Sequence, residues 1–325
     1  MTARAPVTGE VAAEVFTRRA RAERWRLRAR RLRSVLRQFA RQRSGVIGVL
    51  IIGLFTICAL FPEQLVGPFE TVTRASGEKF EPPSLTHILG TDELGRDVLN
   101  LVVHGSRISM SIGLMATIIT VAIGAVIGIV AGFVGGRPDT FLMRITDFFL
   151  ILPTFVLALV LAPILRELLG ESSEFFGIRV TLLVIIVVIG ITSWASTARI
   201  IRSQTLSIRE RAYIDRARVI GASARHIMRR HILPNVLSLI VANTVLVFAG
   251  AVLIETTLSF VGLGDQLAPS WGQILAFAQA SGAPGIGAWW YTASPGIAIV
   301  LVVLSFTLVG NALDSILNPK LAGRR

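Results

Sequence analysis

Long runs of apolar residues, separated by shorter polar segments, dominate the pattern of this 325-residue chain. Six runs reach or approach the length of about 20 residues that a helix needs to cross a bilayer core of about 30 Å. They lie at 45–61, 108–134, 148–165, 180–198, 236–254 and 295–309. The first and the last are short and are expected to extend into flanking residues. The pattern predicts an all-α polytopic membrane protein with six transmembrane helices.

The polar segments between these runs differ sharply in charge. With the N-terminus in the cytoplasm, 27 of the 33 basic residues fall in the four inner segments, 1–44, 135–147, 199–235 and 310–325. Because basic residues concentrate on the cytoplasmic side of membrane proteins, both termini are predicted to be cytoplasmic, in a multi-pass protein of the inner or plasma membrane. The expected organisation is a cytoplasmic tail (1–44), a first span (45–61), an extracytoplasmic loop (62–107), a five-span core (108–320) and a short cytoplasmic tail (321–325).

The N-terminal tail carries most of the net charge of the chain. The formal charge of the whole chain is +13, and residues 1–44 alone contribute +10. Apolar residues recur there at helical spacing, at Trp25, Ala29, Leu32, Leu36 and Phe39. This pattern favours an amphipathic helix in the lipid headgroup layer. A nucleic-acid-binding arm would need the arginines but not the apolar stripe, so membrane lipid is the predicted partner, with no nucleic acid; a disordered retention signal stays open.

Several kinds of chemistry are excluded by the residue inventory. The chain has two lysines, Lys79 and Lys320, and neither lies in a Gly-Lys-Ser/Thr context, so no phosphate-binding loop is present. The single Cys58 cannot form an intramolecular disulfide. The four histidines do not cluster at metal-ligand spacing. We therefore expect no ATPase activity, no catalytic residue, no metal and no cofactor on this chain.

The inner segment 199–235 is far longer than a connection between two spans requires. Its apolar positions fit two short helices with Gly221 at the bend, and Pro234 suits the first turn of the fifth span. The apolar positions are Ile214, Ala217, Val219, Ile220, Ile227 and Ile232. Nine arginines accompany them. The segment is either a docking surface for a soluble partner or a loop anchored to anionic lipid.

Three blocks of sequence resemble a known family. Asp215-Arg216-Ala217-x-x-x-Gly221, followed by His231-Ile232-Leu233-Pro234-Asn235, resembles the EAA loop of ABC-importer permeases, although Asp215 and Arg216 replace the usual Glu-Ala. Residues 87–109 and 255–272, and the ending Asn318-Pro319-Lys320-Leu321, are similar to C-type permeases of the dipeptide, oligopeptide and nickel importers. The resemblance spans residues 42 to 322, nearly everything outside the basic tail.

This resemblance implies a type I ABC importer permease fold and half of a translocation pathway, with a di- or oligopeptide as cargo. It implies four partners: a second homologous permease, two cytoplasmic ABC ATPase subunits that bind ATP and Mg²⁺, and an extracytoplasmic substrate-binding protein. The residues implied in ATPase coupling are Asp215, Arg216, Ala217, Gly221, Ala222, His231, Leu233 and Pro234. Two alternatives stay open: the same architecture carrying nickel chelates or another small solute, and a stand-alone secondary transporter. The latter would bury several ionisable groups at the membrane midplane.

Polar residues within the spans are candidates for the substrate pathway. Asn243 and Thr244 lie in the middle of the fifth run, and Glu255 lies at its outer end. A carboxylate at this depth is costly unless it is paired or wetted. Glu255 could line a site for the ammonium end of a peptide, or it could be a satisfied structural group. Asn243 and Thr244 could equally form hydrogen bonds between helices.

The remaining candidates are outside or between the spans. Asp92, Arg96 and Asp97 could form a charged lip for the substrate-binding protein, or an internal cluster that caps and holds the outer loop. Residues 289–291, Trp-Trp-Tyr, are expected in an interfacial aromatic belt. Small residues at every fourth position of the second span predict close helix packing; they are Ala116, Thr120, Gly124, Gly128 and Gly132. Asp139, Arg144 and Asp147 are expected to pair locally, and Pro153, Pro163 and Pro295 to kink their helices.

Overall fold

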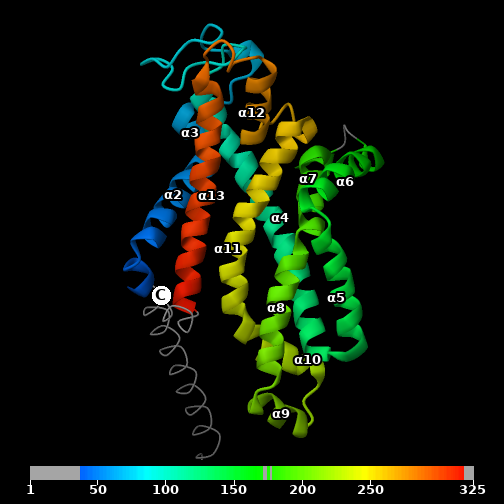
Figure 1. Cartoon of the computed structure of the whole chain (residues 1–325). Coiled ribbons are helices and arrows are strands. Elements are labelled where there is room, and N and C mark those ends of the chain that lie inside the picture. Colours follow the sequence, from blue (N-terminus) through cyan, green and yellow to red (C-terminus); the bar gives the residue numbers. More distant parts are fainter. Residues whose placement is uncertain (1–36, 171–173, 176–177, 318–325) are drawn as a thin grey trace, which may run out of the picture.

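The protein is almost entirely helical (Figure 1). A computed structural model describes residues 37–170, 174–175 and 178–317, so the predicted amphipathic stripe of the tail lies almost wholly outside the described residues. The helical elements up to Arg209 are α2 (Arg43–Leu60), α3 (Pro62–Val66), η1 (Val72–Arg74), α4 (Val98–Val134), α5 (Gly136–Ile151), α6 (Thr154–Leu169), α7 (Val180–Thr192) and α8 (Trp194–Arg209). The later elements are α9 (Ala212–Val219), α10 (Ala224–Ile227), η2 (Met228–Ile232), α11 (Leu233–Leu258), η3 (Ser259–Leu263), α12 (Trp271–Ala280) and α13 (Trp289–Leu317). Two-residue strands, β1 (Glu174–Phe175) and β2 (Ile178–Arg179), pair between α6 and α7.

Within the described residues, five helical stretches are long and apolar enough to cross a membrane, and a bent pair makes a sixth. The five stretches are Arg43–Leu60, Val98–Val134, Val180–Arg209, Ala224–Leu263 and Trp289–Ile316. Each matches one predicted run, apart from Phe61 at the end of the first, so five of the six spans are confirmed as helices. Most of the stretches pass beyond the predicted run at one or both ends, because a helix continues into polar sequence that hydropathy does not detect.

The predicted span 148–165 is wrong as a single helix. The chain turns by 91° between α5 and α6, and the run is divided between the two. Pro153 causes the break, since its ring forces the preceding residue out of the helical region, and Leu152 is indeed extended (φ −77°, ψ 128°). Pro163 and Pro295 lie inside α6 and α13.

The stripe of small residues on α4 packs directly against α8. A Cβ atom on Gly128 would lie 2.6 Å from the carbonyl oxygen of Ala198, and one on Gly132 would lie 2.8 Å from Cβ of Thr205. Thr120 and Ala116 are fully buried on the same side. The packing prediction is confirmed, because a backbone contact this close requires residues with little or no side chain.

The first and the last spans lie side by side (Figure 1). A Cβ atom on Gly48 of α2 would lie 2.6 Å from the backbone oxygen of Ser305 on α13. Gln42 extends the contact, since its Nε2 donates to Oγ of Ser315 at 2.7 Å. Helix α11 packs between α13 and α4, so the helices form one continuous bundle.

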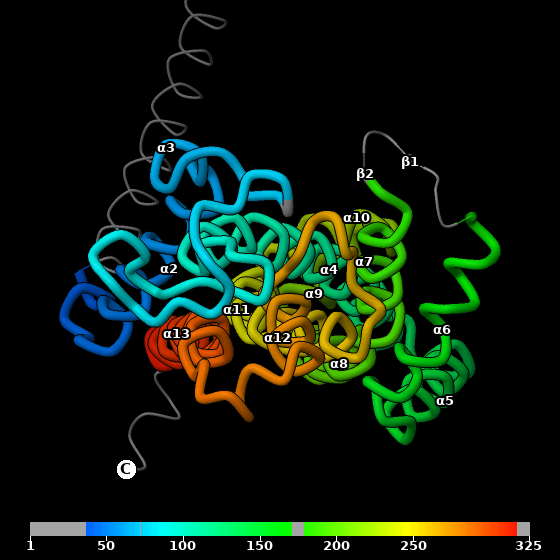
Figure 2. Tube along the Cα trace, turned by 90° about the horizontal axis from the view of Figure 1, so that it is seen from above, coloured from blue at the N-terminus to red at the C-terminus, as the bar shows by residue number. Residues whose placement is uncertain are grey.

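One end of the bundle is covered by the segment between α3 and α4, residues 67–97, seen from above in Figure 2 and called the outer segment after its predicted position. Trp290 of α13 donates from Nε1 to the carbonyl oxygen of Thr91 in this segment at 3.1 Å. Tyr291 is fully buried. The predicted aromatic belt is therefore wrong for Trp290 and Tyr291, which hold the outer segment in place. Trp289 alone of the three is largely exposed.

Candidate functional site

A short helix and a tight turn project from one end of the bundle, opposite the segment between α3 and α4 (Figure 1). Helix α9 is held by Ile214 and Ala217, which pack into a buried cluster with residues of α8, α10 and α11. It ends in a hydrogen-bonded cap: Gly221 N donates to Arg218 O, and Ala222 N donates to Ala217 O. This is the Schellman pattern, with glycine in the left-handed region, and φ of Gly221 is +83°. The predicted bend at Gly221 is confirmed.

The surface beside this turn is apolar and exposed. Val219 and Ile220 are 87% and 83% exposed, although the sequence pattern placed them with the packing residues of two short helices. Among the described residues, no atom lies within 4 Å of a Cβ built on Gly221. Two adjacent β-branched side chains in open solvent next to an unobstructed turn form a surface suited to a partner.

The remaining coupling candidates surround this surface. Asp215 accepts from Nη1 of Arg218 at 3.2 Å across one helical turn, and both side chains are exposed. Arg216 is exposed as well. His231 lies in η2, where its ring is 6.1 Å from the ring of Tyr213 on α9. The structure thus brings residues 213–222 and His231 to one end of the molecule.

Leu233 and Pro234 begin α11, as the sequence predicted for Pro234. The helical stretch nevertheless continues back to Ala224 through the π-type turn η2. Pro234 lacks the N–H that would bond to the carbonyl of Arg230, which accounts for the wider turn at this point. Leu233 is partly exposed. Only Ala222 and Ser223 therefore separate the turn at Gly221 from the helical stretch that is long and apolar enough to cross a membrane.

Two ion pairs join α5 to α8. Arg202 donates from Nε and Nη2 to the two carboxylate oxygens of Asp139, both at 2.6 Å. Arg199 donates to Asp147 at 2.5 Å. The expectation that these carboxylates pair locally is wrong: their partners lie on a different helix. The helix that leads into α9 is thereby fastened to the first half of the bent pair α5–α6.

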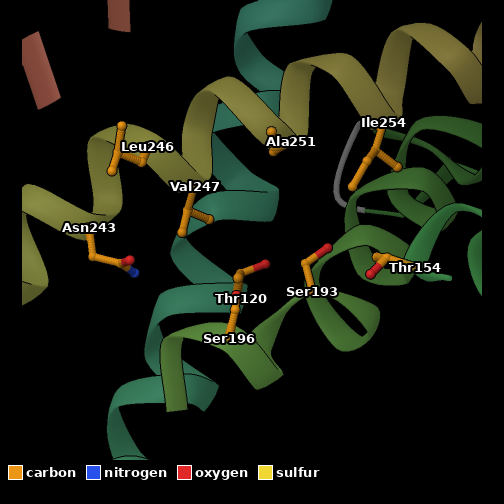
Figure 3. A pocket seen from close by; sticks show the side chains of 10 residues that line it. Thr120, Thr154, Ser193, Ser196, Asn243, Leu246, Val247, Ala251 and Ile254 are labelled. Atoms are coloured by element: carbon orange, nitrogen blue, oxygen red, sulfur yellow. The ribbon is translucent and has the colours of Figure 1, made fainter. Parts of the chain in front are cut away.

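A cavity of about 310 Å³ lies between α11 and the helices α4, α6, α7 and α8 (Figure 3). Its polar lining is Thr120, Thr154, Ser193, Ser196 and Asn243, and the rest is apolar, mostly from α11. Asn243 donates from Nδ2 to Oγ1 of Thr197 at 2.9 Å. The interhelical hydrogen bond expected for Asn243 is therefore present, and its role in a substrate pathway stays a prediction, since the residue also lines the cavity.

Two other pathway candidates do not line this cavity. Thr244 donates to the carbonyl oxygen of Ile240 on its own helix. Glu255 is fully buried, and its Oε1 accepts from Oγ of Ser259 at 2.8 Å. The hydroxyls of Ser109 and Ser270 also face this carboxylate. The geometry favours the structural alternative for Glu255, because it links α11 to α4 and to the start of α12 instead of facing the cavity.

The sequence missed the four hydroxyl residues that line the cavity. Thr154 and Ser193 each stand at a break in a helix, between α5 and α6 and between α7 and α8. Broken helices with polar residues at membrane depth indicate a cavity, since irregular backbone is tolerated there only where protein or water satisfies it. Pro153 was the available signal for the first break.

The charged residues Asp92, Arg96 and Asp97 make their contacts within the protein. Asp92 and Arg96 are buried, and Nε of Arg96 donates to Oδ2 of Asp92 at 2.6 Å. Asp97 caps α4 by accepting from the N–H of Leu99 at 2.8 Å. Burial raises the pKa of Asp97 above its ordinary value, and the nearby carboxylate of Glu70 raises it further. Charges held in this way cannot form a lip for a partner, so the cap-and-cluster alternative is the one that the geometry favours.

Comparison with known proteins finds matches over most of the chain. A family model described as the binding-protein-dependent transport system inner membrane component matches residues 124–323. The dipeptide transport system permease protein of Bacillus subtilis (strain 168) is 36% identical over 277 residues, which cover 83% of this chain and 81% of the relative. The oligopeptide transport system permease protein of the same organism is 31% identical over 288 residues, which cover 87% of this chain and 88% of the relative.

The fold has a counterpart among solved structures. A chain in an inward-facing crystal structure of the MetNI methionine ABC transporter matches with a TM-score of 0.54 at 20% identity, over 66% of this chain and 96% of that chain. The arrangement is the type I importer permease fold, and the apolar helices make this chain a multi-pass membrane protein that works with other ABC components. With an exposed turn at Gly221 and a cavity between its helices, the chain belongs to the family of binding-protein-dependent transport system inner membrane components.

Proposed function

We propose that this chain is the transmembrane permease subunit of an ATP-driven importer of di- and oligopeptides, and that it forms half of the translocation pathway. A second homologous permease supplies the other half. Two ABC ATPase subunits bind ATP and Mg²⁺ at the cytoplasmic side, and an extracytoplasmic substrate-binding protein delivers the cargo. The chain itself binds no nucleotide, and both of its termini are cytoplasmic.

The observation that carries this proposal is the exposed turn at Gly221. Val219 and Ile220 offer apolar surface that the described part of the chain does not cover, and the arginines around them suit a partner groove with an acidic rim. This turn lies between α8 and α11, and residues at the start of α8 and in α11 line the cavity. A force applied at the turn can therefore reach the cavity through α9 and α8 on one side and through the helical stretch that begins at Ala224 on the other.

The Bacillus subtilis relatives carry dipeptide and oligopeptide in their names, and these names support peptide cargo. The same architecture could carry a nickel chelate. Uptake of labelled dialanine by the source organism, with and without an excess of nickel chelate as competitor, separates the two cargoes. A deletion of this gene that lowers nickel accumulation and leaves dialanine uptake unchanged contradicts the peptide proposal.

The coupling role is tested by Gly221→Val in the chromosomal gene. Valine strongly disfavours a positive φ, so the turn must change its shape. We expect the variant to insert normally and to lose nearly all ATP-dependent dialanine uptake. Gly287→Val is the matched control, because Gly287 also has a positive φ (+81°) and open space around it, but lies at the outer end.

Quantitative detection of the chain in isolated membranes establishes insertion in every strain. Normal uptake by the Gly221→Val variant removes the coupling role from this turn. Equal loss of uptake in both valine variants shows a general effect of strained glycine positions, and also contradicts the assignment.

A further inference from the structure

The cavity between the spans has donors for an anion and, among the described residues that line it, no charged side chain. Hydroxyl groups come from Thr120, Thr154, Ser193 and Ser196, and Asn243 adds an amide. The other lining residues are apolar. Figure 3 shows the hydroxyl side chains of the other helices facing the apolar side chains of α11 across the space.

The hydroxyl group of Ser193, a residue that lines this cavity, is an unsatisfied hydrogen-bonding group in the described part of the chain. Its Oγ is buried and has no partner within the described part of the chain. Buried hydroxyls are almost always hydrogen-bonded, and leaving one unpaired is costly. Thr120 is weakly engaged, since its Oγ1 reaches the carbonyl oxygen of Gly190 only at 3.5 Å. A ligand oxygen in the cavity would give the hydroxyl of Ser193 the partner that it lacks.

The amino end of α6 begins at the same cavity. Its first residue, Thr154, lines the space, and no side chain caps the helix, whose N-cap is Pro153. The first N–H groups of a helix lack partners within it, and this end carries a partial positive charge. Helices α5 and α6 are bent by 91° relative to each other. The dipoles of the two helices therefore point in different directions.

The charge that the cavity prefers follows from these groups. Hydroxyl donors and the amino end of a helix stabilise an anion. A peptide ammonium group would need a carboxylate, and none is among the described residues that line the space; Glu255, whose Oε1 accepts from Ser259, is not one of them. Of the two ends of a peptide, the carboxylate is the one that fits.

Resting on the proposed function, we infer that the cavity receives the terminal carboxylate of the peptide, with Ser193, Thr154 and the amino end of α6 as its donors. Recognition of a group common to all peptides is compatible with varied side chains. The inference also predicts that the carboxylate, not the side chains, decides how well a peptide occupies this part of the pathway.

The test compares two probes, N-acetyl-dialanine and its C-terminal amide, on membranes that contain the full chain. Acetylation removes the charge of the amino group from both, so they differ only in whether they carry a carboxylate. Saturation-transfer NMR measures their binding without a substrate-binding protein. We expect Ser193→Ala and Thr154→Val each to weaken binding of the acid about ten-fold, the effect of losing a hydrogen bond to a charged group. Binding of the amide should change less than about two-fold. Thr154→Ser retains the hydroxyl and should behave as the original chain does.

Thr140→Val makes the same chemical change on an exposed part of α5, where Oγ1 of Thr140 donates to Gly136 O, and should leave both probes unaffected. Equal binding of acid and amide to the original chain overturns the inference. So does a loss that is equal for the two probes in the cavity variants, since a structural role would produce it.

Cellular uptake of dialanine, measured in the same strains, separates this inference from the proposed function. Acid-selective binding without any peptide uptake would contradict the peptide proposal and leave the anion site in place. Uptake that is normal in Ser193→Ala and Thr154→Val, together with unchanged binding of the acid, would contradict the site and leave the importer in place.

Discussion

At the scale of single residues, the absence of side chains determines how closely the central helices approach. Gly128 on α4 has the backbone of α8 where a Cβ would be, 2.6 Å from the oxygen of Ala198. Gly53 on α2 has no described atom within 4 Å of the same position. Gly128 therefore has no room for a side chain, whereas Gly53 has room for one, although both lie in apolar stretches of transmembrane helices.

Alanine substitution should separate these two glycines. Gly53→Ala should stabilise the chain by about 0.5–1 kcal/mol, because alanine has the better helix propensity. Gly128→Ala should destabilise it by about 1–3 kcal/mol, because the added methyl group overlaps α8. Thermal unfolding of the purified chain in detergent measures both. A Gly128→Ala variant at least as stable as the original chain would contradict the close approach.

Asp97 gives a prediction about pH. Burial raises the pKa of its carboxyl above the value in the unfolded chain, so the folded state holds the proton more tightly. Stability from this group is complete below the ordinary aspartate pKa and is lost as the pH rises through the raised value. An asparagine at this position would cap the helix comparably and would not titrate.

The stability of Asp97→Asn relative to the original chain should therefore increase as the pH rises across that window, and then level off. Unfolding midpoints from the acid range to neutral pH measure this difference. A relative stability that falls with rising pH would mean that the ionised carboxylate is favoured by its bond to Leu99.

At the scale of elements, the bidentate pair between Asp139 and Arg202 fixes α5 against α8. Both side chains are mostly buried, at 15% and 29% exposure. The pair between Arg209 and Glu210 differs, since the glutamate side chain is 72% exposed. Solvent screens an exposed pair and weakens it, so only the first pair should contribute measurably to stability.

Asp139→Asn should destabilise the chain by about 1–2 kcal/mol, because Arg202 is left with a neutral partner in a mostly buried site. Glu210→Gln should change stability by less than about 0.5 kcal/mol. Chemical unfolding of the two variants provides the comparison. Equal effects would show that burial does not distinguish the two pairs.

The spans could be predicted from sequence because membrane insertion depends on the mean hydropathy of a segment. That quantity is fixed by the segment's own residues and does not depend on which helices pack beside it. The bend at Gly221 was also accessible, since a left-handed cap requires glycine at a known place. The partners of Asp139 and Asp147 were not accessible, because they depend on which helix lies beside α5. The same holds for Trp290, whose hydrogen bond to Thr91 joins residues far apart in the chain.

The cavity is the part of the site that sequence could not predict. Its hydroxyl residues come from separate helices and helix breaks, and each one alone has the pattern of an ordinary serine or threonine in a span. Asn243 was recognised because an amide in the middle of an apolar run is unusual. Val219 and Ile220 were assigned to packing because periodicity does not report which side of a short helix faces the bundle.

At the scale of the whole molecule, the segment between α3 and α4 and the turn at Gly221 lie at opposite ends of the bundle. Ile286 is exposed in the turn before α13, and Val219 is exposed beside Gly221. With a cytoplasmic N-terminus, as the charge distribution predicts, Ile286 faces outward and Val219 faces the cytoplasm.

Single cysteines at these positions test the orientation after Cys58 has been replaced by serine. In intact cells, a membrane-impermeant thiol reagent should label Ile286→Cys and leave Val219→Cys unlabelled. Permeabilised cells should show labelling at both positions. Labelling of Val219→Cys alone in intact cells would reverse the predicted topology.

The contact between α2 and α13 has a consequence for synthesis. Among the described transmembrane helices the ribosome makes α2 first and α13 last, yet the two pack against each other along their length, from Gln42 and Ser315 to Gly48 and Ser305. The first helix to enter the bilayer must therefore wait, without its neighbour, until nearly the whole polypeptide has been translated. A truncated product released before α13 leaves α2 open to lipid and Thr91 without its tryptophan donor, and these are marks by which a membrane protease could distinguish an unfinished chain from a finished one.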